Sequence, residues 1–219
     1  MKQLTIFDLD NTILKGDSDY SWIKYMIDSG FVDKDEYTTK NNYFYEQYEK
    51  GLLDFDEYTI FALSTIKGKS VNNINNLMKD FMEKIIEPMI NIYILKILHD
   101  HNHNNDEMLL ASATNSAVVN PIAKRLGFNN VIATEVEIID DIYSGNYING
   151  SALGEGKKNK VIQWMELNGF RDFKNTTFYS DSINDLPLLM EVEKPVAVNP
   201  DNQLREIALK NNWQIEDLL

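Results

Sequence analysis

The 219-residue chain contains no cysteine, and Arg125, Arg171 and Arg205 are its only arginines. The absence of cysteine excludes a disulfide framework and metal sites built from thiolates. No apolar stretch approaches the roughly 20 residues that a membrane-spanning helix requires. The first residues lead directly into a predicted strand, without the apolar region of a secretory signal peptide. These absences predict a cytoplasmic protein that has no membrane partner.

Positive charge is also scarce. The chain has 21 lysines and arginines against 34 aspartates and glutamates, which gives a net charge of -13. Nucleic acids are bound by basic patches, so no nucleic-acid partner is expected. A small-molecule phosphate ester is compatible with this charge if a metal and a few local groups hold it. The sequence does not indicate an oligomeric state.

Short strands and helices alternate along most of the chain. Apolar runs predict buried strands at residues 4–7, 108–111, 131–134, 176–179 and 196–198. Helical spacing of apolar residues predicts helices at 90–98, 118–126 and 157–167. The segment 135–151, with turn residues at 140–141 and 144–145, predicts a hairpin or flap. This order is typical of an α/β fold with a doubly wound, mostly parallel, Rossmann-like sheet.

The stretch that follows the first strand has a different character. It is helical in pattern and holds more than half of the aromatic residues. Ser70 is a candidate N-cap of a helix over 70–85, and Pro88 is expected to break the chain there. We therefore expect a small α-helical cap at 15–85, inserted into a core formed by 1–14 and 86–219.

An aromatic run lies inside this predicted cap. Its spacing favours the core of a helical bundle over a ligand-binding box. The run consists of Tyr43, Phe44, Tyr45 and Tyr48.

Two acidic motifs stand directly after predicted strands, Asp8-Leu9-Asp10-Asn11-Thr12 and Asp181-Ser182-Ile183-Asn184-Asp185. Open α/β sheets place their ligand sites at the carboxyl ends of strands. If the two strands are neighbours, like charges about 5 Å apart repel by roughly 3 kcal/mol at an effective dielectric of about 20, and a cation is needed. The two motifs provide only oxygen ligands, which suits Mg²⁺. For either motif alone, helix capping and turn formation explain the aspartates equally well.

Four side chains are candidates for phosphoryl chemistry. Asp8 suits a nucleophile that forms an aspartyl-phosphate. Asp10, two residues further along an extended backbone, suits the general acid that protonates a leaving alcohol and the base that then activates water. Ser112 follows a strand and Lys157 precedes a helix, where they are positioned to hold and neutralise a phosphoryl group. Taken singly, Ser112 is better explained as a helix cap and Lys157 as a solvated lysine.

These elements, in this order, resemble the haloacid dehalogenase superfamily, and in particular its phosphoserine phosphatase-like subfamily IB, which carries a small helical cap. The resemblance implies that Asp8 is nucleophile and metal ligand, and that Asp10 is acid and base with its backbone carbonyl on Mg²⁺. It also implies a role for each remaining motif residue: Asp181 as third metal ligand, Ser112 and Asn184 on the phosphate, Lys157 as its counter-charge, and Asp185 orienting Lys157 or a metal-bound water.

The choice of lysine rests on its context. Lys157 is preferred to Lys158 and Lys160 because the preceding Gly-Glu-Gly matches the branch of the superfamily that this chain resembles.

Departures from phosphoserine phosphatases bear on the substrate. Around Asp181 and after Ser112 this chain has serine, alanine and threonine where those enzymes have glycine, and catalysis should survive this. The predicted cap has no arginine for the carboxylate of phosphoserine. Asp17 falls where those enzymes place an acid near the substrate amine, and Asp17 with Asp19 suits an amine-bearing leaving group. Histidinol phosphate fits at least as well as phosphoserine, although a solvated acidic turn explains Asp17 equally well.

We therefore predict a Mg²⁺-dependent phosphomonoesterase that hydrolyses an amino acid or amino alcohol phosphate through an aspartyl-phosphate. A phosphotransferase that uses the same intermediate is the alternative that the sequence does not separate. A dehalogenase is disfavoured by Asp10, because no alcohol leaves in that reaction. A catalytically silent phosphate-binding regulatory protein would be expected to have lost one of Asp8, Asp10, Lys157 or Asp181.

A histidine cluster stands apart from these motifs. His99, His101 and His103 lie among polar residues between a predicted helix and a predicted strand. This context favours a connecting loop over a metal site.

Overall fold

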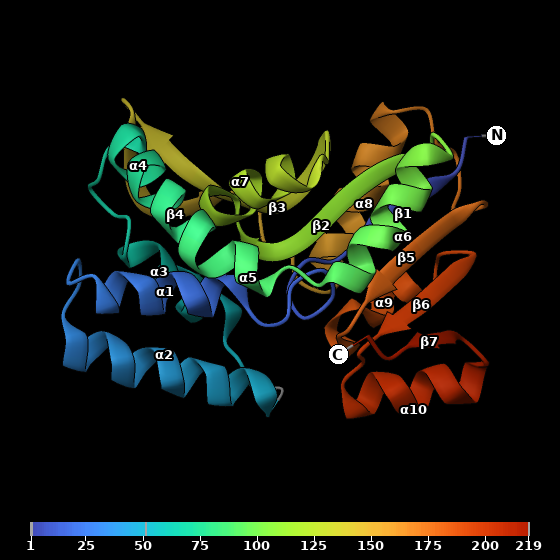
Figure 1. The fold of residues 1–219 in the computed structure, drawn as a ribbon, viewed down its shortest axis with the longest axis horizontal. Helices are drawn as coiled ribbons and strands as arrows, with labels where there is room; N and C mark the ends of the chain where they lie inside the picture. Colours follow the sequence, from blue (N-terminus) through green and yellow to red (C-terminus); the bar gives the residue numbers. More distant parts are fainter. Residues whose placement is uncertain (1, 51, 219) are drawn as a thin grey trace.

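The computed structural model describes residues 2–50 and 52–218. Within them a seven-stranded sheet has the order β4-β3-β2-β1-β5-β6-β7 (Figure 1). Neighbouring strands are parallel except β3 and β4. The strands are β1 (Leu4–Phe7), β2 (Glu107–Asn115), β3 (Asn130–Ile139), β4 (Ile142–Ile148), β5 (Thr176–Ser180), β6 (Lys194–Val198) and β7 (Gln214–Glu216). The predicted doubly wound, mostly parallel sheet is confirmed.

Helices cover both faces of the sheet, and the alternation of side chains along β1 shows how. Phe7 packs in the core under one set of helices, α6 (Ile92–His103) and α7 (Ser116–Leu126). Leu4 and Ile6 point to the opposite face, where a second core is covered by α8 (Glu155–Leu167), α9 (Leu186–Leu189) and α10 (Asn202–Asn211). A strand buried on both faces is expected to be apolar throughout, as β1 largely is.

Helices fill the chain between β1 and β2: α1 (Ser18–Asp28), α2 (Lys34–Glu49), α3 (Phe55–Ser64), α4 (Val71–Phe81), a π-helix (Met82–Ile86) and α5 (Glu87–Met89). The N-cap side chains of α1 to α4 each accept a backbone N–H of the first turn. Ser70 is the cap of α4, as predicted. Pro88 does not break the chain where predicted, because the backbone stays right-handed helical from α4 through the π-helix into α5, and Ile90 is the residue that turns extended.

The helical insertion and the sheet share apolar contacts. Trp22 and Phe81 of the insertion belong to the same buried cluster as Phe7 and Val118. We propose residues 15–85 as a cap on a core of 1–14 and 86–219, with this shared cluster joining the two. None of the helices in the described residues has the length and apolar character needed to cross a membrane.

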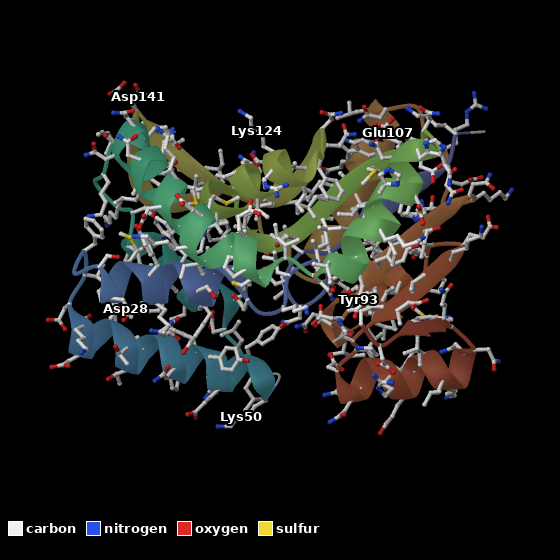
Figure 2. All side chains as sticks on the ribbon, viewed as in Figure 1. Asp28, Lys50, Tyr93, Glu107, Lys124 and Asp141 are labelled. Atoms are coloured by element: carbon white, nitrogen blue, oxygen red, sulfur yellow. The ribbon has the colours of Figure 1, made fainter. Side chains whose placement is uncertain are left out.

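The predicted hairpin is formed by β3 and β4. Asp140 and Asp141 turn the chain with φ of +47° and +63°, and Figure 2 shows Asp141 at the outer tip. The turn predicted at 144–145 is wrong, because both residues lie inside β4. Gly145 is needed there since a Cβ would come within 2.7 Å of the Lys67 side chain that follows α3.

Two further predictions are corrected by the fold. The strand predicted at 108–111 extends to Asn115, and Asn115 caps α7, so Ser112 lies in a strand and is not a helix cap. The three histidines belong to the end of α6 and not to a loop. His101 is the inward member, with Nδ1 2.7 Å from Asp106 and Nε2 2.9 Å from the hydroxyl of Tyr179.

Candidate functional site

The two acidic motifs meet at one edge of the sheet. β1 pairs with β2 on one side and β5 on the other, and Phe7 lies opposite both Leu110 and Tyr179. The backbone N–H of Asp8 continues this register by donating to the carbonyl of Tyr179 at 2.9 Å. From β1 the chain proceeds to β2, and from β5 to β6 on the opposite side. The motifs therefore lie at the point where the strand order reverses, the usual ligand crevice of such sheets.

A cavity at this crevice brings the predicted residues together. Every residue proposed from the sequence for catalysis, metal binding or substrate binding lines it. These are Asp8, Asp10, Asp17, Ser112, Lys157, Asp181, Asn184 and Asp185. The cap contributes the opposite wall, mainly through aromatic residues of α2 and α3.

Lys157 is the central cation of the site and is only 2% exposed. Its Nζ donates to Asp8 Oδ1 at 2.8 Å and to Asp185 at 2.8 Å. Burial lowers the pKa of the ammonium, but the two carboxylates outweigh this effect and raise it, so Lys157 stays charged. Ser180 also donates to Asp185 at 2.7 Å, which holds that carboxylate against the lysine.

The two alternative lysines make their ion pairs outside the cavity. Lys158 pairs with Glu155 at 2.8 Å, and Lys160 lies 3.9 Å from Glu135. Neither belongs to the cavity lining. The geometry therefore favours Lys157 for the role of counter-charge.

The loop before α8 needs glycine to place Lys157. Gly154 has φ of +56°, a conformation that residues with a Cβ rarely adopt. At Gly156 a Cβ would stand 2.3 Å from the carbonyl oxygen of Ser151. The Gly-Glu-Gly-Lys sequence thus permits the tight approach that turns Lys157 inward.

Gly156→Ala is expected to destabilise the fold by about 1–3 kcal/mol, since backbone must shift to relieve the contact. Phosphate release should fall as well, because Lys157 moves with the backbone. Thermal unfolding and phosphate release would be compared with Glu166→Ala, an exposed change on the same helix α8. A melting temperature equal to that of the wild type would contradict this account.

Asp10 is held by two hydrogen bonds, one from the start of α1 and one from β2. Its Oδ1 accepts the backbone N–H of Ser18 at 2.6 Å and its Oδ2 accepts the hydroxyl of Thr114 at 2.8 Å. Loss of hydration, reinforced by Asp17, raises the pKa of Asp10 to about 7 despite these hydrogen bonds. A carboxyl group that titrates near neutrality suits general acid and base catalysis.

Asp8 and Asp181 form the candidate metal site. Both carboxylates lie 3.3 Å from the hydroxyl of Thr12 and are nearly buried. Burial raises the pKa of Asp8 to about 7 and that of Asp181 well above its usual range, and the nearby charge of Asp8 raises the pKa of Asp181 further. A divalent cation between them would relieve this repulsion.

The structure limits how Asp10 contributes to a metal. Among the described residues, no three side chains of His, Cys, Asp or Glu are arranged to hold an ion. Since the Asp10 carboxylate accepts hydrogen bonds from Thr114 and Ser18, the backbone carbonyl of Asp10 is the group that remains available as a metal ligand. The residues present fit an oxygen-ligated hard cation such as Mg²⁺ in that arrangement.

Mg²⁺ is expected to raise the melting temperature of the metal-free protein by about 5–10 °C at concentrations near 100 times its Kd, because a ligand bound only by the folded state stabilises that state. Asp181→Asn should abolish most of this gain. Asp35→Asn, an exposed change on α2, is the matched control and should retain it. An undiminished gain in Asp181→Asn would argue that the cation binds elsewhere.

Several residues in or beside the cavity had no assigned role in the sequence analysis. Thr12 and Thr114 contact the aspartates described above, and Asn115 donates to Asp19 at 2.7 Å. For Thr12 the signal was its place in the first motif, and for Thr114 and Asn115 it was their position directly after Ser112. Asp17 both caps α1, accepting the N–H of Tyr20 at 2.7 Å, and lines the cavity.

The aromatic run is divided between two environments. Phe44 belongs to the small cluster of the helical insertion, as the bundle interpretation predicts. Phe44, Tyr48 and the partly exposed Tyr45 also line the cavity, whereas Tyr43 is exposed and does not line it. Preferring a bundle core to a ligand-facing surface was therefore wrong for Tyr45 and Tyr48, because α2 lies at the edge of the bundle and turns this face toward the acidic motifs.

The sequence profile of the haloacid dehalogenase-like hydrolases matches residues 5–190. The chain belongs to the haloacid dehalogenase-like hydrolases. A histidinol-phosphatase of Neisseria meningitidis serogroup C (strain 8013) is 39% identical to it over 218 residues, covering 98% of each chain. A phosphoserine phosphatase of Mycobacterium tuberculosis (strain ATCC 25618 / H37Rv) is 29% identical over 219 residues, covering 96% of this hydrolase and 69% of that protein.

Solved structures agree with this placement. A protein of unknown function from Bordetella pertussis Tohama I matches the hydrolase with a TM-score of 0.94 and 34% identity over the whole of both chains. A substrate-bound phosphoserine phosphatase complex matches with a TM-score of 0.70 and 16% identity, covering 100% and 94%, which shows a shared fold. The predicted superfamily, the phosphoserine phosphatase-like architecture and the prediction of a phosphatase-type enzyme are confirmed.

Proposed function

We propose that this hydrolase is a Mg²⁺-dependent phosphomonoesterase that acts on an amino alcohol phosphate such as histidinol phosphate through an aspartyl-phosphate on Asp8. The observation that carries the proposal is the buried contact of Lys157 with Asp8 at 2.8 Å, at the strand edge where Asp10 is held separately. A carboxylate beside a fixed cation, with a second carboxyl group that titrates near neutrality, suits phosphoryl transfer in two steps.

Asp8 and Asp10 act in both steps of the proposed reaction. In the first, a carboxylate oxygen of Asp8 attacks phosphorus, the bond to the leaving oxygen breaks, and Asp10 gives that oxygen its proton. In the second, Asp10 takes a proton from a water molecule whose oxygen attacks the phosphoryl group, which releases phosphate and restores Asp8. Lys157, Ser112 and Asn184 hold the phosphoryl oxygens, and Mg²⁺, when bound, supplies further positive charge for the transferring group.

The charge of the cavity supports a cationic leaving group. The described lining contains six aspartates and one cation, Lys157. Arg125 and Arg205 pair with Glu87 and Asp217 at the surface and do not line the cavity. A substrate carboxylate such as that of phosphoserine would therefore find no second cation, whereas an amine beside Asp17 would be stabilised. The Neisseria relative named histidinol-phosphatase agrees with this preference.

The cap supports a closed site during the first step. The hydroxyl of Tyr48 on α2 lies 3.4 Å from that of Ser182 in the second acidic motif. This contact places cap and core together over the phosphoryl end of the cavity, where exclusion of water favours the protein nucleophile.

The test is phosphate release with Mg²⁺ from L-histidinol phosphate, phosphoserine, sugar phosphates and nucleotides. Preference for L-histidinol phosphate is the expected result, and preference for phosphoserine would overturn the assignment of the leaving group. The same reaction with added glycerol distinguishes hydrolysis from transfer: phosphoglycerol formed in place of free phosphate would identify a phosphotransferase. Absence of phosphate release from the whole panel would overturn the proposed activity.

A further inference from the structure

The end of the cavity formed by the cap holds an aspartate that the phosphoryl chemistry does not use. Asp19, on α1, is 6% exposed and lines the cavity. Its Oδ1 accepts from Asn115 at 2.7 Å, and the hydroxyl of Tyr58 is a further hydrogen-bonding neighbour. Burying a carboxylate is costly when no cation pairs with it, and the only lining cation, among the described residues, is Lys157 at the opposite motif.

A second buried group beside Asp19 is unsatisfied. Asn41, on α2, is 3% exposed and lines the same cavity. Its Nδ2 donates to the carbonyl of Tyr20, the residue after Asp19, at 3.3 Å. This contact identifies the other amide atom as the oxygen, and Oδ1 accepts no hydrogen bond from the residues that the structure describes. A buried acceptor without a partner is costly, and an N–H or O–H supplied from the cavity would satisfy it.

The remaining walls of this end are flat and aromatic. Asn41 shares its face of α2 with Phe44, Tyr45 and Tyr48, at helical spacings of three, four and seven residues, and all of them line the cavity. Aromatic faces favour a planar or cationic partner over a flexible aliphatic chain.

We propose that Asp19 and Asn41 form a subsite for a second nitrogen-bearing group of the leaving alcohol, a planar N–H-containing heterocycle such as an imidazole. The inference rests on the proposed function, because it assumes that the phosphoryl group lies at Asp8 and the primary amine near Asp17. Asp19 then pairs with one ring N–H and Asn41 Oδ1 accepts the other. The subsite thus sets which amino alcohol phosphate is chosen and takes no part in phosphoryl transfer.

Asp19→Asn separates this role from a structural one. The asparagine still accepts the hydrogen bond from Asn115 while the charge is lost, so the fold should persist. The KM for L-histidinol phosphate should rise about 10- to 100-fold, the usual effect of losing a hydrogen bond to a charged group. The ratio of kcat/KM for L-histidinol phosphate to that for phosphoethanolamine, which has the amine but no ring, should fall by a similar factor.

Two further variants complete the kinetic test. Asn41→Leu keeps the volume but removes the acceptor, and should lower the same ratio about fivefold. Asp28→Asn, at the outer end of the same helix α1 (Figure 2), is the matched surface control and should leave the ratio unchanged. An unaltered ratio in both Asp19→Asn and Asn41→Leu would overturn the subsite.

Binding of product-like ligands tests the subsite independently of turnover. By calorimetry with the wild type, L-histidinol should bind more tightly than L-phenylalaninol, whose ring has the same attachment but no N–H. Equal binding would overturn the inference even if phosphate release from L-histidinol phosphate is observed. Failure of the proposed function has a different signature, because Asp8→Asn would then leave phosphate release intact or the wild type would release none.

Discussion

Replacing Asp8 by asparagine is expected to lower kcat for phosphate release about 10⁵-fold, because the neutral amide cannot form the aspartyl-phosphate. The fold should not suffer. Burial already raises the pKa of Asp8 to about 7, so the charged form is disfavoured at this position, and Lys157 keeps its second partner, Asp185. A melting temperature equal to or above that of the wild type is therefore expected.

The Asp8 prediction is checked by phosphate release and by chemical trapping. Reduction of a quenched reaction with borohydride converts an aspartyl-phosphate to homoserine, which mass spectrometry should locate at position 8 in the wild type alone. Asp140→Asn, in the exposed hairpin turn where asparagine tolerates the φ of +47°, is the control and should retain full activity. Activity of Asp8→Asn within tenfold of the wild type would rule out Asp8 as the nucleophile.

Asp10→Asn is expected to affect the two steps unequally. With an alkyl phosphate, kcat should fall about 10³-fold, because the leaving alcohol no longer receives a proton from Asp10. With p-nitrophenyl phosphate the leaving group departs without a proton, so the first step should survive while hydrolysis of the intermediate slows. The carbonyl oxygen of the asparagine can still accept the backbone N–H of Ser18 while its NH2 group donates to the hydroxyl of Thr114, which should limit structural change.

Rapid mixing would reveal this difference between the steps. In Asp10→Asn, p-nitrophenol should appear as a burst of about one equivalent per active site followed by slow turnover, the behaviour of an accumulating covalent intermediate. The wild type, in which both steps are fast, serves as the comparison. An equal loss of rate with both substrates and no burst would assign Asp10 a purely structural role.

Strands that are buried over their whole length were predictable from the sequence. β1 and β5 sit in the middle of the sheet and are buried on both faces, so neither contains a charged residue and the acidic motif after each stands out. β2 was predicted too short because three of its last four residues, Ser112, Thr114 and Asn115, are polar and line the cavity. β7 was missed since it is a three-residue edge strand with a single apolar side chain.

The aromatic residues of α2 show a different limit of sequence reasoning. A helical stripe of aromatic side chains looks the same whether it packs in a bundle or faces a cavity. Only the position of α2 against the acidic motifs, made visible by the contact of Tyr48 with Ser182, distinguishes the two cases. Asn41 is an extreme example, because an asparagine in a polar helix carries no signal until its amide oxygen is found buried and without a partner.

The sequence by itself determined which chemical groups the protein has available: two acidic motifs after strands, a lysine in a glycine-rich turn, and no arginine in the cap. Tertiary structure decided how these groups act. Lys157 meets Asp8 across 149 residues of chain because β1 and β5 are neighbours and α8 covers the face beside them. Burial, which local sequence does not encode, then raises the pKa of Asp10 to about 7 and turns an ordinary carboxylate into a candidate acid and base.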